Sequence, residues 1–262
     1  MNAVTAEGAV HLQVEGAIAS VTFDRPAARN AMTWSMYESL MAICEQLRVD
    51  ESVRVVRFRG AGGEAFVAGT DIAQFQSFQS GEDGVAYERR IDACIALLAS
   101  LPMPTVAVVE GWAIGGGLAI ATACDIRIAT PGTRFGVPIA RTLGNCLSVT
   151  NVARLVAAFG RPRVQRLLLA AELLSTEEAQ QAGYLADVVP PAEVNAAADR
   201  WCSKLAALAP VTQAVSKETL ERLLVRELPQ AEDLIRRCYG SADFREGVTA
   251  FVAKRPPAWR GR

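Results

Sequence analysis

The sequence predicts an α/β fold in which strands alternate with helices as far as residue 151 and helices dominate the remainder. The first observation is the segment 105–125, where a β-branched run leads through three consecutive glycines into an apolar helical pattern. The second is the order strand, strand, helix, which recurs without close sequence repetition. The third is the change of pattern after residue 151, where nearly every segment has helical spacing.

The part before residue 151 supplies the predicted sheet. Alternating runs on either side of Gly16 indicate a hairpin, and Thr33 is placed to begin a helix. Pro102 and Pro104 end a helix whose apolar side chains recur at three- and four-residue steps. The predicted elements are strands within 11–23, a helix to about 47, a strand at 53–59, a short extended piece at 66–69, a helix at 84–100, a strand from 105, the glycine-initiated helix and a strand at 126–129.

The part after residue 151 is predicted to be almost entirely helical. Ser175 and Glu178 fit a capping box, and Gly183 fits a helix C-cap. The predicted helices are 152–159, 163–170, 176–183, 192–208, 211–224, 229–239 and 242–253, with one short strand at 186–189. The last four helices must cover apolar faces somewhere, so we expect them to pack on the core or on another subunit.

Composition excludes several classes of function. The chain has 262 residues, 51% of them hydrophobic, and a net charge of −1, so no field attracts nucleic acid or an anionic membrane. It has no basic N-terminal segment followed by an apolar stretch and no apolar run near the roughly 18 residues of a membrane span, so we expect a cytoplasmic protein. Six cysteines lack CxxC or Cys/His spacing, which predicts reduced thiols and no metal site.

The glycine-rich turn is the first candidate for chemistry. Glycine lets the backbone approach a ligand closely, and the first amides of a helix have no intrahelical acceptor. Such amides suit an oxyanion hole, in which N–H groups stabilise negative charge on a carbonyl oxygen. The first turn of this helix, Leu118 to Ile120, carries no acidic or basic side chain.

Three segments together resemble the crotonase, or enoyl-CoA hydratase/isomerase, superfamily. They are FVAGTDI at 66–72, WAIGGGLAIA at 112–121 and FVAKRP at 251–256, supported by DRPAARNA at 24–31, CDIRIA at 124–129 and STEEAQQAGYLAD at 175–187. The resemblance implies a β-β-α spiral core over residues 1–190 that carries the site. Residues 191–262 would form a C-terminal helical region used for oligomerisation, in a homotrimer or a dimer of trimers.

The resemblance also implies a substrate, an acyl-CoA thioester, with coenzyme A as part of the substrate and no permanently bound cofactor. Two amides, assigned to Ala68 and Gly116, would hold the thioester oxygen. Ala27, Ala28 and Arg29 would line the nucleotide channel, and Phe251 with Lys254 would approach adenine and phosphate. The other residues expected at the substrate are Thr70, Ile72, Gly115, Ala119, Ile139 and Arg141.

The chain departs from the family where hydratases carry two catalytic glutamates. The first position is Ala119, and the second is Ile139 after Phe135, Gly136, Val137 and Pro138. Since neither side chain relays a proton, hydration by the two-carboxylate route should be severely weakened.

Several residues are candidate replacements. Asp71 is close in sequence to the assigned amide at position 68, but it also suits a loop-fixing role. Asn145 is placed to orient water, whereas Ser148 is better suited to capping a helix. Cys146 fits a buried inert thiol better than a nucleophile, and Arg141 suits an acyl carboxylate or an ordinary salt bridge.

Two classes of function remain open. The first is an enzyme that stabilises a thioester enolate and carries out hydration, dehydration, isomerisation or a related lyase step, or a hydrolysis or decarboxylation through the same enolate. The second is a catalytically inactive CoA-thioester-binding protein. The first requires a proton carrier that faces the space beside Ala119 and Ile139, and the second requires none.

Overall fold

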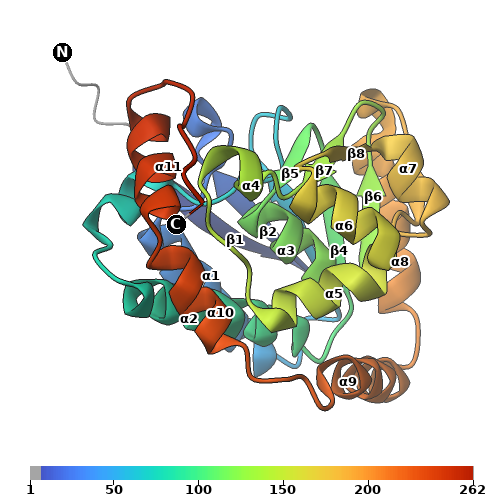
Figure 1. Cartoon of the computed structure of the whole chain (residues 1–262). Coiled ribbons are helices and arrows are strands. Elements are labelled where there is room, and N and C mark those ends of the chain that lie inside the picture. Colours follow the sequence, from blue (N-terminus) through green and yellow to red (C-terminus); the bar gives the residue numbers. More distant parts are fainter. Residues whose placement is uncertain (1–6, 262) are drawn as a thin grey trace.

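Two sheets form the centre of the structure, a computed structural model that describes residues 7–261 (Figure 1). The larger sheet has the order β1-β2-β3-β4-β6-β9, and the smaller has the order β5-β7-β8. Neighbouring strands are parallel except in the pairs β1/β2 and β7/β8. The strands are β1 (Ala9–Glu15), β2 (Ile18–Asp24), β3 (Val55–Gly60), β4 (Thr105–Val109), β5 (Trp112–Ile114), β6 (Ile126–Ala129), β7 (Arg134–Gly136), β8 (Leu173–Ser175) and β9 (Asp187–Val188).

Helices surround both sheets. The α-helices are α1 (Trp34–Arg48), α2 (Gly81–Ala99), α3 (Gly116–Ala123), α4 (Ile139–Thr142), α5 (Val149–Phe159), α6 (Arg161–Leu169), α7 (Thr176–Gln181), α8 (Val194–Ala206), α9 (Pro210–Val225), α10 (Glu232–Tyr239) and α11 (Ala242–Val252). Three short 3₁₀ helices are η1 (Pro26–Ala28), η2 (Ile72–Ser77) and η3 (Pro191–Glu193). The mixed α/β class and the predicted longer elements are confirmed, including the capping box at Ser175 and Glu178. Within residues 7–261, no helix is both long enough and apolar enough to cross a bilayer.

The small sheet is the part that the sequence pattern does not predict. Strands β5, β7 and β8 have three residues each, too few for a period to emerge. The chain enters this sheet from β4 through Gly111, whose φ of +66° favours glycine. A Cβ on Gly111 would lie 1.8 Å from the Glu64 carbonyl oxygen, so a side chain there would clash with the loop that follows β3.

Most C-terminal helices share the core of the strands that precede them. Ala197, Ala198 and Cys202 of α8 pack on side chains of β3, β4 and β6. Tyr239 of α10 and Phe244 of α11 join an aromatic cluster with Tyr87 of α2, and also with Phe75 and Phe78. Within the described range 191–261, the C-terminal region therefore shares the core of the preceding strands and helices and has no separate one.

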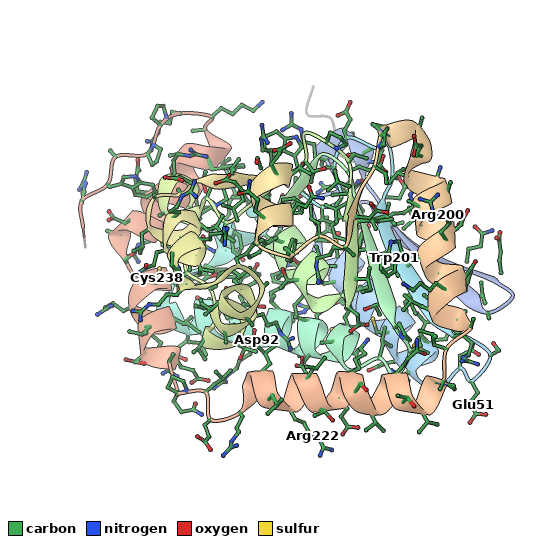
Figure 2. The ribbon with its side chains drawn as sticks, turned by 90° about the vertical axis from the view of Figure 1, so that its right-hand side faces the viewer. Glu51, Asp92, Arg200, Trp201, Arg222 and Cys238 are labelled. Atoms are coloured by element: carbon green, nitrogen blue, oxygen red, sulfur yellow. The ribbon has the colours of Figure 1, made fainter. Side chains whose placement is uncertain are left out.

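Helix α9 differs from its neighbours because it has no buried residue. It lies along one edge of the molecule in two views related by a 90° turn, and in the second Arg222 points away from the fold (Figures 1 and 2). Lys217 ties this helix to the core, because its Nζ donates to Asp125 Oδ2 at 2.7 Å and to the Met103 carbonyl at 3.0 Å. Asp125 thus has a structural role, because it anchors α9 to the core.

The contact between α2 and α10 predicts a specific sensitivity at Gly84. Alanine normally stabilises a helix interior by about 1 kcal/mol relative to glycine. A Cβ on Gly84, however, would lie 2.1 Å from the Tyr239 Cγ, and overpacking of this kind costs about 1–3 kcal/mol. We expect Gly84→Ala to lower the free energy of unfolding in urea, and Ala86→Gly, at an exposed position in the same helix, to cost only about 1 kcal/mol. A more stable Gly84→Ala protein would contradict this packing.

Candidate active site

The first turn of α3 lies against the extended segment that ends at Thr70. The Ile114 N–H donates to the Val67 carbonyl at 3.0 Å, and the Val67 N–H donates to the Trp112 carbonyl at 3.2 Å. A Cβ on Gly117 would lie 1.9 Å from the Val67 oxygen, and one on Gly116 would lie 2.4 Å from the Tyr37 hydroxyl oxygen. Glycine is therefore required at both positions for this close approach.

Two backbone amides at this junction have no protein acceptor within residues 7–261. They belong to Gly116, the first residue of α3, and to Thr70. The two residues are neighbours, because a Cβ on Gly116 would lie 3.4 Å from the Thr70 Oγ1. Unpaired N–H groups facing a hollow are available to a ligand oxygen.

The Ala68 amide does not meet the expectation set for it. Its N–H donates to the Arg29 carbonyl at 3.0 Å, so it is already satisfied by the backbone. The assignment of Ala68 as a free donor is corrected for that reason, and Thr70, two residues further along, has the free N–H. The sequence identified the segment but not which of its amides is free.

Thr70 and Gly116 both line a cavity of about 170 Å³. This volume is small beside the roughly 300–1,000 Å³ of pockets for drug-sized ligands, so it suits a short acyl group. Its walls are mostly apolar. The lining residues are Ala68, Gly69, Thr70, Ile72, Phe75, Tyr87, Glu88, Ile91, Ile114, Gly115, Gly116, Ala119, Pro138, Ile139, Thr142, Leu143, Asn145, Leu147, Asn151 and Phe251.

The cavity brings together much of what the sequence predicted. Ala119 and Ile139, which stand where the family's glutamates are expected, are both in its wall. Phe251, which is 48% exposed, also lines this cavity, so its ring lies beside the cavity of its own chain. The other predicted residues that line it are Ala68, Thr70, Ile72, Gly115, Gly116 and Asn145.

Other predicted residues lie outside this cavity. Ala27 and Arg29 line a separate hollow of about 370 Å³ beside η1. Ala28 belongs to η1 but does not line this hollow. Arg141 and Lys254 are exposed and line neither hollow.

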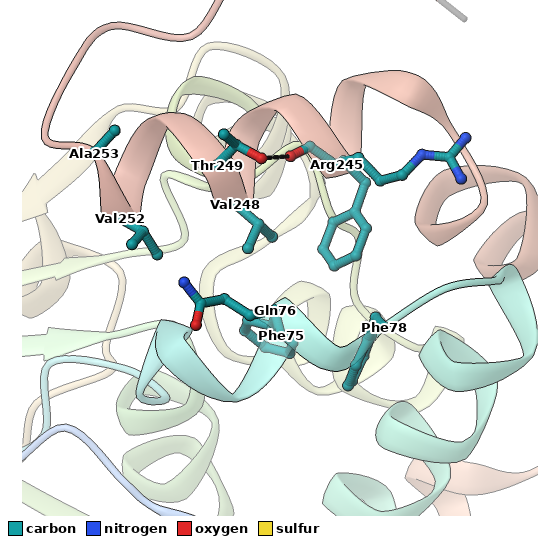
Figure 3. A pocket seen from close by; sticks show the side chains of 9 residues that line it. Phe75, Gln76, Phe78, Arg245, Val248, Thr249, Val252 and Ala253 are labelled. Carbon is teal, nitrogen blue, oxygen red and sulfur yellow. Dashed lines mark hydrogen bonds between the residues drawn. The ribbon is translucent and has the colours of Figure 1, made fainter.

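A further groove of about 480 Å³ lies between η2 and α11, and its lining includes Phe75 and Gln76 of η2 and Val248 and Val252 of α11 (Figure 3). Phe75 also lines the cavity that contains Thr70 and Gly116, so the groove and this cavity adjoin at the Phe75 ring.

Asp71 has a structural environment rather than a catalytic one. Its carboxylate pairs with the Arg25 guanidinium at 2.8 Å and accepts the Ala73 N–H at 3.1 Å. It does not line the cavity. These contacts fix the loop after Thr70, which is the role weighed against catalysis in the sequence.

Glu88 on α2 is the carboxyl group that sequence analysis missed. It lines the cavity and is only 2% exposed. The Tyr239 hydroxyl donates to its Oε1 at 2.7 Å, and the Ser148 backbone N–H donates to its Oε2 at 2.8 Å. Burial outweighs these two hydrogen bonds and raises the pKa of Glu88 to about 8, so the side chain is mostly protonated at pH 7.

The sequence contained a signal for Glu88. The apolar face of its helix includes Ile91, Cys94, Ile95 and Leu98, and Glu88 lies three residues before Ile91 on the same face. An acidic residue on an apolar helix face must be buried with partners or serve a site.

Two amide oxygens in the cavity wall are buried without a donor. They are the Oδ1 atoms of Asn145 and Asn151. The Asn145 Nδ2 donates to the Tyr239 hydroxyl at 3.2 Å, and the Asn151 Nδ2 donates to Asp92 Oδ1 at 3.0 Å. Each buried polar atom without a partner costs about 1–3 kcal/mol, so a guest that donates hydrogen bonds would relieve this cost.

Neither Cys146 nor His11 has the environment of a catalytic group. Contact with Cys238 and burial raise the pKa of Cys146, which makes its thiolate scarce at pH 7. His11 is on the surface, where its Nε2 lies 3.1 Å from Asp24 Oδ2. Within the described residues, no group of acidic, histidine and cysteine side chains could hold a metal ion.

Comparison with known proteins gives consistent matches over nearly the whole chain. A profile of the enoyl-CoA hydratase/isomerase family matches residues 13–262. The short-chain-enoyl-CoA hydratase of Clostridium acetobutylicum is 31% identical over 250 residues, which cover 94% of this chain and 95% of that protein.

Solved structures agree with the sequence matches. An enoyl-CoA hydratase/carnithine racemase from Magnetospirillum magneticum is 31% identical, with a TM-score of 0.79 and coverage of 97% of this chain and 96% of that one. A methylmalonyl-CoA decarboxylase reaches a TM-score of 0.88 at 24% identity, covering 97% of this chain and 98% of that one, and at this identity it shows a shared fold only.

The buried carboxyl predicts a pH-dependent stability. Because the pKa of Glu88 is raised from 4.5 to about 8 in the folded state, the folded protein binds an extra proton between these values. Its free energy of unfolding therefore falls as pH rises through this window, by up to about 1.4 kcal/mol for each pH unit. Glu88→Gln removes this titration, so urea unfolding from pH 5 to 8 should show the wild type losing stability relative to the variant. Parallel curves would contradict the shift, and exposed Glu38→Gln is the matched control.

Proposed function

The chain belongs to the enoyl-CoA hydratase/isomerase family, and on that premise we propose that its cavity binds a short acyl-CoA thioester and stabilises its enolate. The observation that carries this proposal is the pair of unpaired amides, Thr70 and Gly116, on the wall of one small apolar cavity. A thioester carbonyl that accepts both N–H groups becomes more polarised, and its α-protons become more acidic.

Stabilising an enolate requires hydrogen-bond donors at the thioester oxygen. Enolate formation places negative charge on the thioester oxygen, and one oriented donor of this kind is typically worth about 3 kcal/mol. The donors are oriented before substrate arrives, because Gly116 begins α3 and the Met32–Asp71 backbone hydrogen bond of 2.8 Å holds the chain beside Thr70. Little reorganisation is then needed during the reaction.

Coenzyme A would extend from the cavity toward the surface. The hollow beside η1 is the proposed nucleotide site, because Arg29 lies there and its carbonyl oxygen is bonded to Ala68 in the cavity wall. Exposed Lys254, three residues after Phe251, would supply a cation for phosphate.

Ordinary hydration is not the proposed reaction. Ala119 and Ile139 face the cavity without any acid or base, and loss of each such group typically costs about 10²- to 10⁴-fold in rate. Isomerisation, another lyase step, hydrolysis or decarboxylation through the same enolate needs a different proton carrier. A CoA-thioester-binding protein without turnover is the second candidate, favoured by the same two apolar side chains.

The exposed face of α9 supports self-association. Five apolar side chains on this helix are at least 40% exposed, namely Val211, Val215, Leu220, Leu223 and Val225. A helix with no buried residue and this much exposed apolar surface is typical of an interface. We propose that α9 contributes to a homotrimer or a dimer of trimers.

The association predicts a mass that depends on α9. Mass photometry of the wild type should give a trimer or hexamer. Leu220→Glu combined with Leu223→Glu should shift the population toward smaller species, because charge on both partners opposes burial. A monomeric wild type would contradict the proposed assembly, and Glu218→Gln, exposed on the same helix, is the control.

The function proposal predicts binding without efficient hydration. Calorimetry with butanoyl-CoA should show saturable binding, and crotonyl-CoA hydration should be at least about 100-fold slower than for the C. acetobutylicum relative assayed alongside. Ala119→Glu with Ile139→Glu should raise hydration by at least about tenfold, since both positions face the cavity. Absence of binding at millimolar thioester would contradict the proposed ligand, and ordinary wild-type hydration would contradict the role given to the missing carboxylates.

A further inference from the structure

We propose that Glu88 of α2 exchanges a proton with the α-carbon of the bound acyl group, in place of the carboxylates absent at positions 119 and 139. This inference rests on the proposed function, because it needs a thioester held at Thr70 and Gly116. Glu88 lines the same cavity as those two residues, although it comes from a different element of the fold.

Among the described residues that line the cavity, Glu88 and Tyr87 are the two with titratable side chains. The Tyr87 hydroxyl lies 3.0 Å from the Thr70 Oγ1, and that oxygen is also 2.9 Å from the Tyr37 hydroxyl. Burial raises the pKa of Tyr87 well above 10, so its phenolate is scarce at neutral pH. Glu88 is therefore the group suited to carry a proton under ordinary conditions.

The carboxyl of Glu88 is held in one orientation. Its two oxygens accept from different elements, Oε1 from Tyr239 of α10 and Oε2 from the backbone of Ser148 before α5. A catalytic carboxyl needs a fixed geometry of this kind, because proton transfer depends on heavy-atom distances near 3 Å.

The groups that face Glu88 do not neutralise it. They are Tyr37 of α1, Tyr87 and Asp92 of α2, Cys146 in the loop before α5, and Cys238 and Tyr239 of α10. None of these side chains is a cation at neutral pH. The carboxylate form therefore lacks an ion-pair partner and is a stronger base than an exposed glutamate.

A second, independent observation is that this side of the cavity offers hydrogen-bond acceptors to a guest. Asn151 is 3% exposed, and its Oδ1 has no donor, while the Oδ1 of Asn145 lacks one as well. Both residues line the cavity with Glu88. Because both acceptors belong to residues that line the cavity, a hydroxyl on the acyl chain or a water beside it would supply the hydrogens.

The proposed step balances without a further reactant. The Glu88 carboxylate takes a proton from the α-carbon, and the electron pair of the broken C–H bond moves to the thioester oxygen as the enolate. A new O–H bond then exists on Glu88. Return of this proton to the carbon restores the thioester. In D₂O the new O–H of Glu88 exchanges its proton for a solvent deuteron, so the carbon then receives deuterium in place of the hydrogen it lost.

Deuterium incorporation into butanoyl-CoA, measured by mass spectrometry, tests this step without knowledge of the natural acyl chain. The wild type should exchange α-hydrogen, with a rate that rises about tenfold per pH unit and levels off above pH 8, because the carboxylate form is the base. Glu88→Gln should lower the rate by at least about 100-fold, while the calorimetric Kd for butanoyl-CoA changes less than threefold. Glu88→Asp keeps a titratable group, so it should retain slow exchange with a pH dependence.

Glu38→Gln is the matched control, because Glu38 is an exposed acid on α1 that does not line the cavity. Its exchange rate should stay within threefold of the wild type. Wild-type binding without exchange, or equal exchange by folded Glu88→Gln, would overturn the role of Glu88 and leave the ligand proposal intact. Failure of butanoyl-CoA to bind the wild type would instead overturn the proposed function.

Discussion

The close approach of α3 to the segment ending at Thr70 is the constraint on which the rest of the site depends. Gly116 and Gly117 permit it, because a side chain at either position would meet the Tyr37 hydroxyl or the Val67 carbonyl. The approach leaves the amides of Thr70 and Gly116 unpaired beside a cavity, whereas the Ala68 amide is satisfied by Arg29. A free donor at a helix start is common, but two beside one apolar cavity suit the carbonyl oxygen of the proposed thioester.

The C-terminal helices help to set the environment of the Glu88 carboxyl, which itself comes from α2. Helix α10 packs against α2 at Gly84, and this contact delivers the Tyr239 hydroxyl to Glu88. The loop before α5 adds the Ser148 N–H from the opposite side. Burial outweighs these two hydrogen bonds, so the pKa of Glu88 rises and the side chain is mostly neutral at pH 7. Helical packing far from the glycine turn thus sets the acid–base chemistry that is available beside it.

Much of the fold was predictable from local pattern, whereas contacts between distant segments were not. The hairpin about Gly16, the helix begun by Thr33 and the capping box at Ser175 are local signals, and each is confirmed. The three-residue strands of the small sheet are set by long-range pairing and leave no period. The same limit applies in the site: residues 66–72 were identified, but the satisfied amide at Ala68 depends on Arg29. Glu88 was readable only as a charge on an apolar helix face, and its partners lie 60 and 151 residues further along the chain.

The central claim is that two backbone amides polarise one thioester carbonyl, and isotope-edited infrared difference spectroscopy tests it most directly. Butanoyl-CoA labelled with ¹³C at the thioester carbon would be bound to the wild type and compared with the same thioester in buffer. Hydrogen bonds from Thr70 and Gly116 should lower the carbonyl stretching frequency of the bound form, because they withdraw electron density onto oxygen. A bound thioester whose carbonyl band stays at its solution frequency would contradict the claim.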